Sequence, residues 1–171
     1  MSNTVLPLVA TIFLGLCPSA AGQTARPPSC DTPEFRQFDF WLGDWTVHLP
    51  DGRLAGTNRI TREFKGCVLH EHWTGHSGSN GESLNIFDAA RGRWHQTWVD
   101  DSGTLLILDG ALVGASMALS AQQTGSGGTR TIERITWTPN DVGQVRQLWE
   151  ASPDGGKTWT VQFDGLYTRK K

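Results

Sequence analysis

The stretch Phe38-Asp39-Phe40-Trp41-Leu42-Gly43-Asp44-Trp45 decides the fold class of this chain. Its closing Gly-x-Trp triplet runs into an apolar–polar alternation in which Trp45, Val47 and Leu49 share one face of an extended strand. A short helix is expected just before it, because Asp31-Thr32-Pro33-Glu34 offers a capping side chain, a proline in the first turn and then an acid. The region therefore predicts a short helix followed by a strand with one buried face.

From this point onward the chain consists of strand-length runs separated by polar, glycine-rich turns. The expected strands are 41–49, 53–64, 67–74, 82–88, 93–100, 104–109, 111–121, 129–138, 144–151 and 158–169. Short strands joined by close turns predict an antiparallel meander, and a long meander removes its exposed edges most simply by closing. We therefore predict an all-β, up-and-down barrel of about ten strands, with a two-sheet sandwich as the alternative. Because side chains alone fill a barrel of only about eight strands, we also expect an internal cavity.

The N-terminal residues have the composition of a secretory signal peptide. They carry no charged side chain, Val5–Leu16 is almost wholly apolar, and Pro18–Gly22 supplies small residues for cleavage. The apolar run is shorter than the roughly 20 residues of a membrane span. We expect a signal peptide over 1–22, an N-terminal segment with the short helix over 23–37 and a barrel domain over 38–171. The protein is then exported, to the periplasm or beyond.

Cleavage after residue 22 leaves two cysteines, Cys30 and Cys67. An even number of cysteines in an exported protein favours a disulfide, which would join the segment before the first strand to a later strand. Two buried free thiols are the alternative.

Charge and hydropathy exclude two classes of partner. The net charge is −2 with scattered signs, so no basic surface indicates nucleic acid. After the N-terminal segment no second long apolar run exists, so no stable membrane span is expected. The sequence does not indicate an oligomeric state.

Polar residues occur on the apolar faces of four expected strands. These faces are Leu69, Glu71 and Trp73; Trp94, Gln96 and Trp98; Glu133, Ile135 and Trp137; and Val145, Gln147 and Trp149. If they point into the barrel, their polar residues share one tryptophan-lined cavity, together with Asn85 beside Phe87. The predicted ligand-binding residues are Glu71, Trp73, Asn85, Gln96, Trp98, Glu133, Gln147 and Trp149.

This pattern favours a protein that binds a small, partly apolar molecule. Indole rings would supply contact area, while amides and an acid would orient the ligand. A buried carboxylate must find a partner or raise its pKa, and Arg169, on one face with Phe163 and Tyr167, is a candidate interior cation. A polar network that satisfies itself, or faces that pack outward, is the alternative.

Two other classes of function stay open. An enzyme could use Glu71 as a general acid or base, or pair it with Glu133 as a glycosidase does. No G-x-S-x-G motif or other nucleophile signature is present, and we expect no catalytic residue. A protein-interaction module without a small ligand is the third hypothesis.

Two local motifs are expected to be structural. His70 and His72 form a His-x-His pair on one strand, with His76 following, but no cysteine or histidine cluster elsewhere completes a zinc site. We therefore expect solvent-facing histidines, no metal and no cofactor.

The second motif, Ser152–Trp159, fits S-x-D-x-G-x-T-W, the Asp box of sialidase propellers. Here it predicts a single hairpin turn held by the Asp side chain.

The opening 38–45 stretch resembles that of a bacterial family of exported proteins, a domain of unknown function with a lipocalin-like (calycin) barrel. Further similar segments are Gly66-Cys67-Val68-Leu69 with Glu71 and Trp73, Ser83-Leu84-Asn85 with Asp88, residues 94–100, residues 146–150 and residues 163–167. The resemblance implies a barrel and no particular activity, and His70, His72 and His76 do not belong to the family pattern.

Within the wider calycin group the resemblance implies structural roles for Gly43, Trp45 and Arg169. The Trp of the Gly-x-Trp triplet plugs the closed end of such barrels, and an Arg of the last strand lies over it. Nitrobindins, related barrels, hold haem through a histidine late in the chain. No histidine follows His95 here, so haem binding of that kind is not expected.

Overall fold

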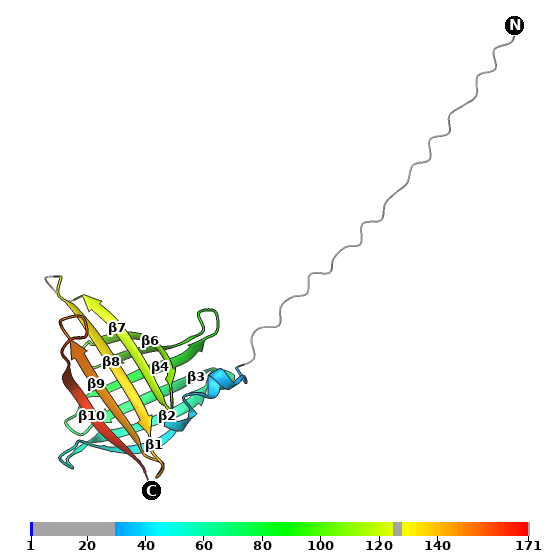
Figure 1. Ribbon diagram of the computed structural model, residues 1–171. Coiled ribbons are helices and arrows are strands. Elements are labelled where there is room, and N and C mark those ends of the chain that lie inside the picture. The colour runs from blue at the N-terminus through cyan, green and yellow to red at the C-terminus, as the bar shows by residue number, and fades with distance from the viewer. Residues whose placement is uncertain (2–29, 125–127, 171) are drawn as a thin grey trace.

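The computed structural model describes Met1, residues 30–124 and residues 128–170. These residues form a closed barrel of antiparallel strands, in which each strand pairs with its sequence neighbours and β1 closes on β10 (Figure 1). The strands are β1 (Gly43–His48), β2 (Leu54–Glu63), β3 (Val68–Gly75), β4 (Asn80–Asp88), β5 (Arg93–Asp100), β6 (Leu105–Val113), β7 (Ser116–Thr124), β8 (Arg130–Pro139), β9 (Val145–Ser152) and β10 (Thr160–Arg169). The predicted barrel is confirmed, and the sandwich alternative is wrong.

The predicted signal peptide, apart from Met1, lies outside the described residues. In the part of the chain that is described, no helix is long and apolar enough to cross a bilayer. The three helical segments there are short 3-10 turns: η1 (Pro33–Arg36), η2 (Asp39–Trp41) and η3 (Phe64–Gly66).

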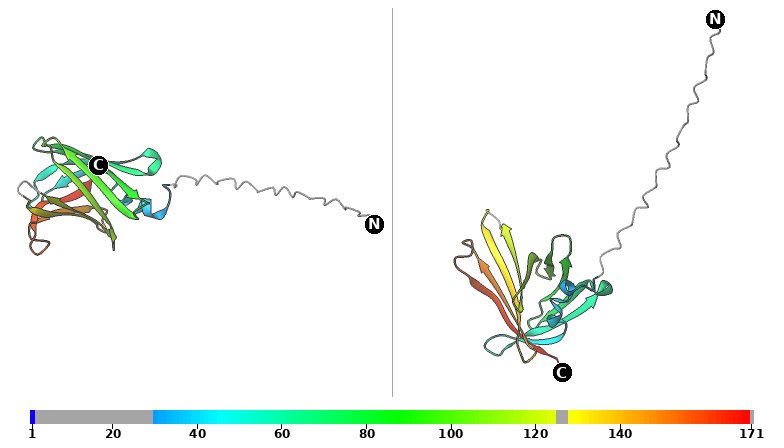
Figure 2. Two further views of the ribbon diagram at one scale, coloured as in Figure 1. Left: turned by 90° about the horizontal axis from the view of Figure 1, so that it is seen from above. Right: turned by 45° about the vertical axis from the view of Figure 1, so that its right-hand side comes forward.

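The predicted N-terminal helix is present as the turns η1 and η2, which lie against the barrel (Figure 2). Between them they insert Phe38 and Trp41, both fully buried. The Phe38 ring stacks on Trp41 at 4.9 Å and meets the rings of Trp94 and Trp137 edge-on at 5.6 and 5.2 Å. These four residues and Trp45 form the aromatic plug, which fills one end of the barrel.

The Gly-x-Trp triplet and the last strand close this end together. Trp45 is fully buried, and its Nε1 donates a hydrogen bond to the Trp41 carbonyl at 2.8 Å. The Arg169 guanidinium lies 4.2 Å from the centre of the Trp45 ring and donates to the Leu42 carbonyl at 2.6 Å. A Cβ at Gly43 would stand 2.0 Å from Arg169 Nη1, and the φ of +130° favours glycine, so another residue would strain the backbone and displace the guanidinium. Arg169 therefore lies at the closed end and is not an interior cation.

The predicted disulfide is present and joins Cys30 to Cys67. It ties the segment before η1 to the start of β3. Arg36 reinforces the junction, because its Nη2 donates to the carbonyls of Cys30 and of Gly66. The chain that carries the aromatic plug is thus fixed to the barrel wall at its N-terminal side.

One strand boundary differs from the sequence prediction. The expected break between Asp109 and Ala111 lies inside β6, and the hairpin turns instead at Gly114, whose φ is +61°. Gly110 is a mid-strand residue, and a Cβ on it would stand 2.0 Å from the Ala118 carbonyl of β7. The glycine permits a close approach of two backbones, which a sequence pattern does not distinguish from a turn.

The Asp-box hairpin between β9 and β10 is held by its aspartate, as predicted. Asp154 accepts hydrogen bonds from the backbone N–H groups of Lys157 and Thr158 at 3.0 and 2.9 Å and from the Ser152 hydroxyl at 2.8 Å. Hydrogen bonds led by the Thr158 hydroxyl lower the pKa of Asp154 to about 2. This motif is structural and lies apart from the cavity described next.

Candidate ligand-binding cavity

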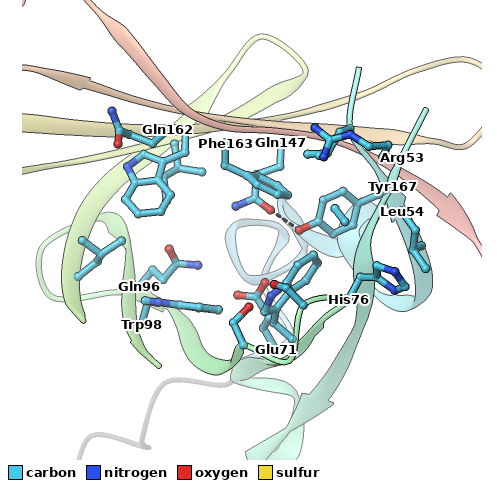
Figure 3. A pocket seen from close by; sticks show the side chains of 18 residues that line it. Arg53, Leu54, Glu71, His76, Gln96, Trp98, Gln147, Gln162, Phe163 and Tyr167 are labelled. Carbon is cyan, nitrogen blue, oxygen red and sulfur yellow. Dashed lines mark hydrogen bonds between the residues drawn. The ribbon is translucent and has the colours of Figure 1, made fainter. Parts of the chain in front are cut away.

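The barrel holds a cavity of about 450 Å³ on the side away from the aromatic plug. Its mouth is formed by the loops that follow β1 and β3, which contribute Leu49, Arg53, His76, Ser77 and Ser79. Figure 3 looks into it, with Gln147 and Tyr167 on one side and Glu71 on the other. The lining therefore combines side chains from strands that are far apart in the sequence.

All four strand faces that combine a polar residue with apolar neighbours point into the barrel, so the alternative of faces that pack outward is wrong. Six of the predicted site residues line the cavity: Glu71, Trp73, Gln96, Trp98, Gln147 and Trp149. On β3, β5 and β9 the order is the same, with an apolar residue near the plug, then the polar residue, then a tryptophan toward the mouth. Strand alternation thus produces a polar belt between two apolar layers.

The other two predicted residues, Asn85 and Glu133, do not line the cavity and instead hold residues that do. Asn85 is fully buried, and its Oδ1 accepts a hydrogen bond from Gln96 Nε2 at 2.8 Å. Glu133 Oε2 accepts from Trp149 Nε1 at 2.6 Å. Their contribution to the site is to orient Gln96 and Trp149.

Glu71 is the buried acid of the cavity, and only 3 % of it is exposed. Its Oε1 accepts a hydrogen bond from Asn58 Nδ2 and its Oε2 one from the Ser83 hydroxyl, each at 2.6 Å. Burial raises the pKa of Glu71 to about 7, although the hydrogen bonds from Ser83 and Asn58 act in the opposite direction. The carboxyl group is therefore held by protein donors on both oxygens.

A second polar group faces Glu71 through Asn58. The Tyr167 hydroxyl donates to Gln147 Oε1, and Asn58 Nδ2 lies 3.2 Å from the same hydroxyl. Burial, and then the charge of Glu71, raise the pKa of Tyr167 well above its usual value. Tyr167 is therefore a neutral hydrogen-bond donor that fixes the Gln147 amide.

Two polar atoms of the cavity remain available for a ligand. Among the described residues, Gln96 Oε1 has no hydrogen-bond donor and Gln147 Nε2 has no acceptor. Both glutamines line the cavity. The site therefore offers one amide acceptor and one amide donor beside the Glu71 carboxyl group.

Asn58, Ser83 and Tyr167 are parts of the site that were not predicted from the sequence. A signal for two of them was present, because Ser83 alternates with Asn85 and Phe87, and Asn58 alternates with the apolar Ile60. Gln162 was also missed: it lines the cavity together with its neighbour Phe163, because the β9–β10 register shifts between Val161 and Phe163. A bulge of this kind lets consecutive residues reach one face, which simple alternation forbids.

Comparison with known proteins does not add to these residues. No protein-family model matches the sequence, and a search of curated proteins found no match. The family resemblance therefore rests on the quoted residues alone.

Proposed function

We propose that this protein binds a small, partly apolar molecule inside the barrel. The observation that carries the proposal is the cavity, because its volume of about 450 Å³ suits a small organic ligand. Its walls include Trp73, Trp98, Trp149 and Phe163, which provide large, rigid contact surfaces. Ligand pockets typically combine such walls with a few converging polar groups.

The polar groups of the cavity indicate which end of the ligand lies deepest in the barrel. Gln96 Oε1 is the free acceptor and Gln147 Nε2 the free donor, and both line the cavity with the Glu71 carboxyl group, whose oxygens already accept hydrogen bonds from the protein. A ligand with a hydrogen-bond donor and an acceptor at one end and an apolar ring system at the other satisfies both regions. We therefore expect its polar end to lie deep, toward the plug, and its apolar part to lie among the tryptophans.

The disulfide supports an exported protein, since such bonds persist in oxidising compartments. We propose that the mature protein acts in the periplasm or outside the cell, as the resemblance to exported bacterial barrels implies. Mass spectrometry of the protein isolated from its own host checks this directly, because removal of the predicted leader changes the mass of the chain.

An enzyme that uses Glu71 is less well supported. Both Glu71 oxygens already accept hydrogen bonds from protein donors, and Glu133, the acid paired with it in that hypothesis, is held by Trp149 and does not line the cavity. If the protein is nevertheless an enzyme, Glu71→Gln abolishes turnover while binding persists.

An exposed apolar patch is the feature that the interaction hypothesis requires. The outer face of β4, β5 and β6 exposes Leu84, Val99, Leu105 and Ile107, which lie on paired strands. Analytical ultracentrifugation measures the oligomeric state and so tests whether copies of the protein associate through this face. A strictly monomeric protein argues against such association.

Binding in the cavity predicts that Trp98→Ala weakens the affinity for the ligand by about tenfold, as removal of one large aromatic contact does. The ligand is first identified by native mass spectrometry of protein purified without denaturation, and its affinity is then measured by fluorescence titration. Trp159→Ala is the matched control, because Trp159 lies in the Asp-box hairpin outside the cavity and stacks on Arg134.

The proposal is wrong if the purified protein carries no small molecule and its fluorescence does not respond to a broad library of aromatic amines, alcohols and acids. Equal losses of affinity in Trp98→Ala and Trp159→Ala would also contradict it, because the ligand would then bind elsewhere or the variants would share a general defect. Thermal melting of both variants separates these two cases.

A further inference from the structure

The His-x-His pair of β3 points away from the cavity. Glu71, between the two histidines, faces inward, whereas His70 and His72 are 19 % and 41 % exposed on the outer wall. In the strand register His72 pairs with Glu82 of β4, and His70 pairs with Thr61 of β2, two residues from Glu63. Three adjacent strands thus bring two imidazoles and two carboxylates together.

The ligand atoms of this cluster lie close enough together to share one metal ion. Glu63, His70 and His72 each offer one ligand atom, and these atoms all lie within 4.8 Å of one another. Glu82 is 3.1 Å from His70 Nε2 and 3.2 Å from His72 Nδ1, and Glu63 is 3.5 Å from His70 Nδ1. Neighbouring ligand atoms around a tetrahedral zinc ion are about 3.3–3.5 Å apart.

The charge of the cluster also favours a cation. Within the described part of the chain, no lysine or arginine forms an ion pair with Glu63 or Glu82. Glu82 meets the two imidazoles, and Glu63 meets His70 and accepts a hydrogen bond from the Thr61 hydroxyl at 2.9 Å. Other surface acids of this barrel have a guanidinium partner, such as Asp109 with Arg91 and Asp164 with Arg146. With neutral histidines the cluster therefore carries two negative charges that no permanent cation balances.

We propose that Glu63, His70, His72 and Glu82 form a binding site for a divalent transition-metal ion of the zinc class. Imidazole nitrogen and carboxylate oxygen are the ligands that zinc accepts in His/Glu sites. Each histidine has a second ring nitrogen, and for His70 a carboxylate lies beside both nitrogens, so one carboxylate can bind the ion while the other orients the ring. The ion would join β3 to the neighbouring strand that supplies the bound carboxylate, on the outside of the barrel.

This site lies on the opposite face of β3 from the proposed ligand cavity, and none of its four residues lines that cavity. The sequence shows no further histidines or cysteines that complete a site, whereas the additional ligands proposed here are glutamates on neighbouring strands. Only the strand register places them beside the pair.

Isothermal titration calorimetry with Zn²⁺ tests the site on the mature, oxidised protein. We expect one equivalent of Zn²⁺ to bind, and we expect His70→Ala and His72→Ala each to weaken binding by more than about tenfold. Substitution with Co²⁺ gives a second readout, because a tetrahedral His/Glu site produces visible absorption bands. Binding should also raise the melting temperature, and a chelator should reverse the increase.

The matched control is His48→Ala, since His48 lies on β1 away from the cluster. The proposal is overturned if the wild-type protein does not bind Zn²⁺ at micromolar concentrations, or if His48→Ala weakens binding as much as His70→Ala does. Zn²⁺ that binds only between two protein molecules, which native mass spectrometry detects as a metal-dependent dimer, would overturn it as well. Glu82→Gln keeps the side-chain shape and is expected to lower the affinity, which shows that the carboxylate charge takes part.

Discussion

Replacing Trp45 with alanine is expected to destabilise the barrel by about 3–5 kcal/mol, the range found when a buried large aromatic side chain is removed. The indole is fully buried in the aromatic plug, and its Nε1 donates to the Trp41 carbonyl. Its ring also supports the Arg169 guanidinium, which reaches on to Leu42. The substitution thus leaves a cavity, an unpaired carbonyl and an arginine without its aromatic contact.

Urea unfolding followed by circular dichroism measures this loss. Trp159→Ala is the control, because Trp159 packs in a surface hairpin, and we expect it to cost only about 1 kcal/mol. Arg169→Lys separates the charge from the planar contact, because lysine keeps the charge but cannot stack on the indole in the same way. A free energy of unfolding for Trp45→Ala within about 1 kcal/mol of wild type would show that the plug does not stabilise the barrel as argued.

Local sequence patterns were sufficient to predict the barrel and to group the residues that share a strand face, but not to decide which faces point inward. Each turn is marked by residues such as glycine, and the alternation on β3, β5 and β9 placed Glu71, Gln96 and Gln147 on faces with large apolar neighbours. Alternation is reliable here because one face of every strand must be buried in a closed barrel. The same reasoning located Trp73, Trp98 and Trp149 in the cavity wall.

The position of an inward side chain along the barrel axis could not be predicted in the same way. Asn85 and Glu133 have the correct inward face, but whether an inward side chain reaches the cavity depends on how the tilted strands are staggered. The bulge near Gln162 and the mid-strand position of Gly110 likewise depend on the partner strand. Register is a property of strand pairs, and a single strand does not encode it.

The outer wall illustrates the same limit. His70 and His72 could be recognised as a pair from their spacing alone, but Glu63 and Glu82 join them only through the pairing of β3 with β2 and β4. One strand thus contributes to two sites, with Glu71 on the cavity side and the histidines on the other. The two sites can be tested with separate variants, because Trp98 lines the cavity and His70 belongs to the outer cluster.

Replacing both Cys30 and Cys67 with serine is expected to lower the free energy of unfolding by about 3–4 kcal/mol. The bond closes a loop of 37 residues, and the loss of loop-closure entropy in the unfolded chain at that length has about this size. The loop contains η1, η2, β1 and β2, so without the bond the unfolded chain gains freedom over the whole segment that builds the plug. The folded barrel keeps its hydrogen-bonded strands, so the far-ultraviolet circular dichroism spectrum should stay unchanged.

Denaturant unfolding of the wild-type protein with and without a reducing agent, beside the double serine variant, measures the effect. Reduction of the wild type should reproduce the loss seen in the variant, and the same reducing agent should not affect the variant itself. A loss below about 1 kcal/mol would mean that the unfolded chain already holds the two cysteines close together. A larger loss, accompanied by weaker ligand binding, would mean that the bond also maintains the folded plug and, through Tyr167 and Asn58, the polar belt of the cavity.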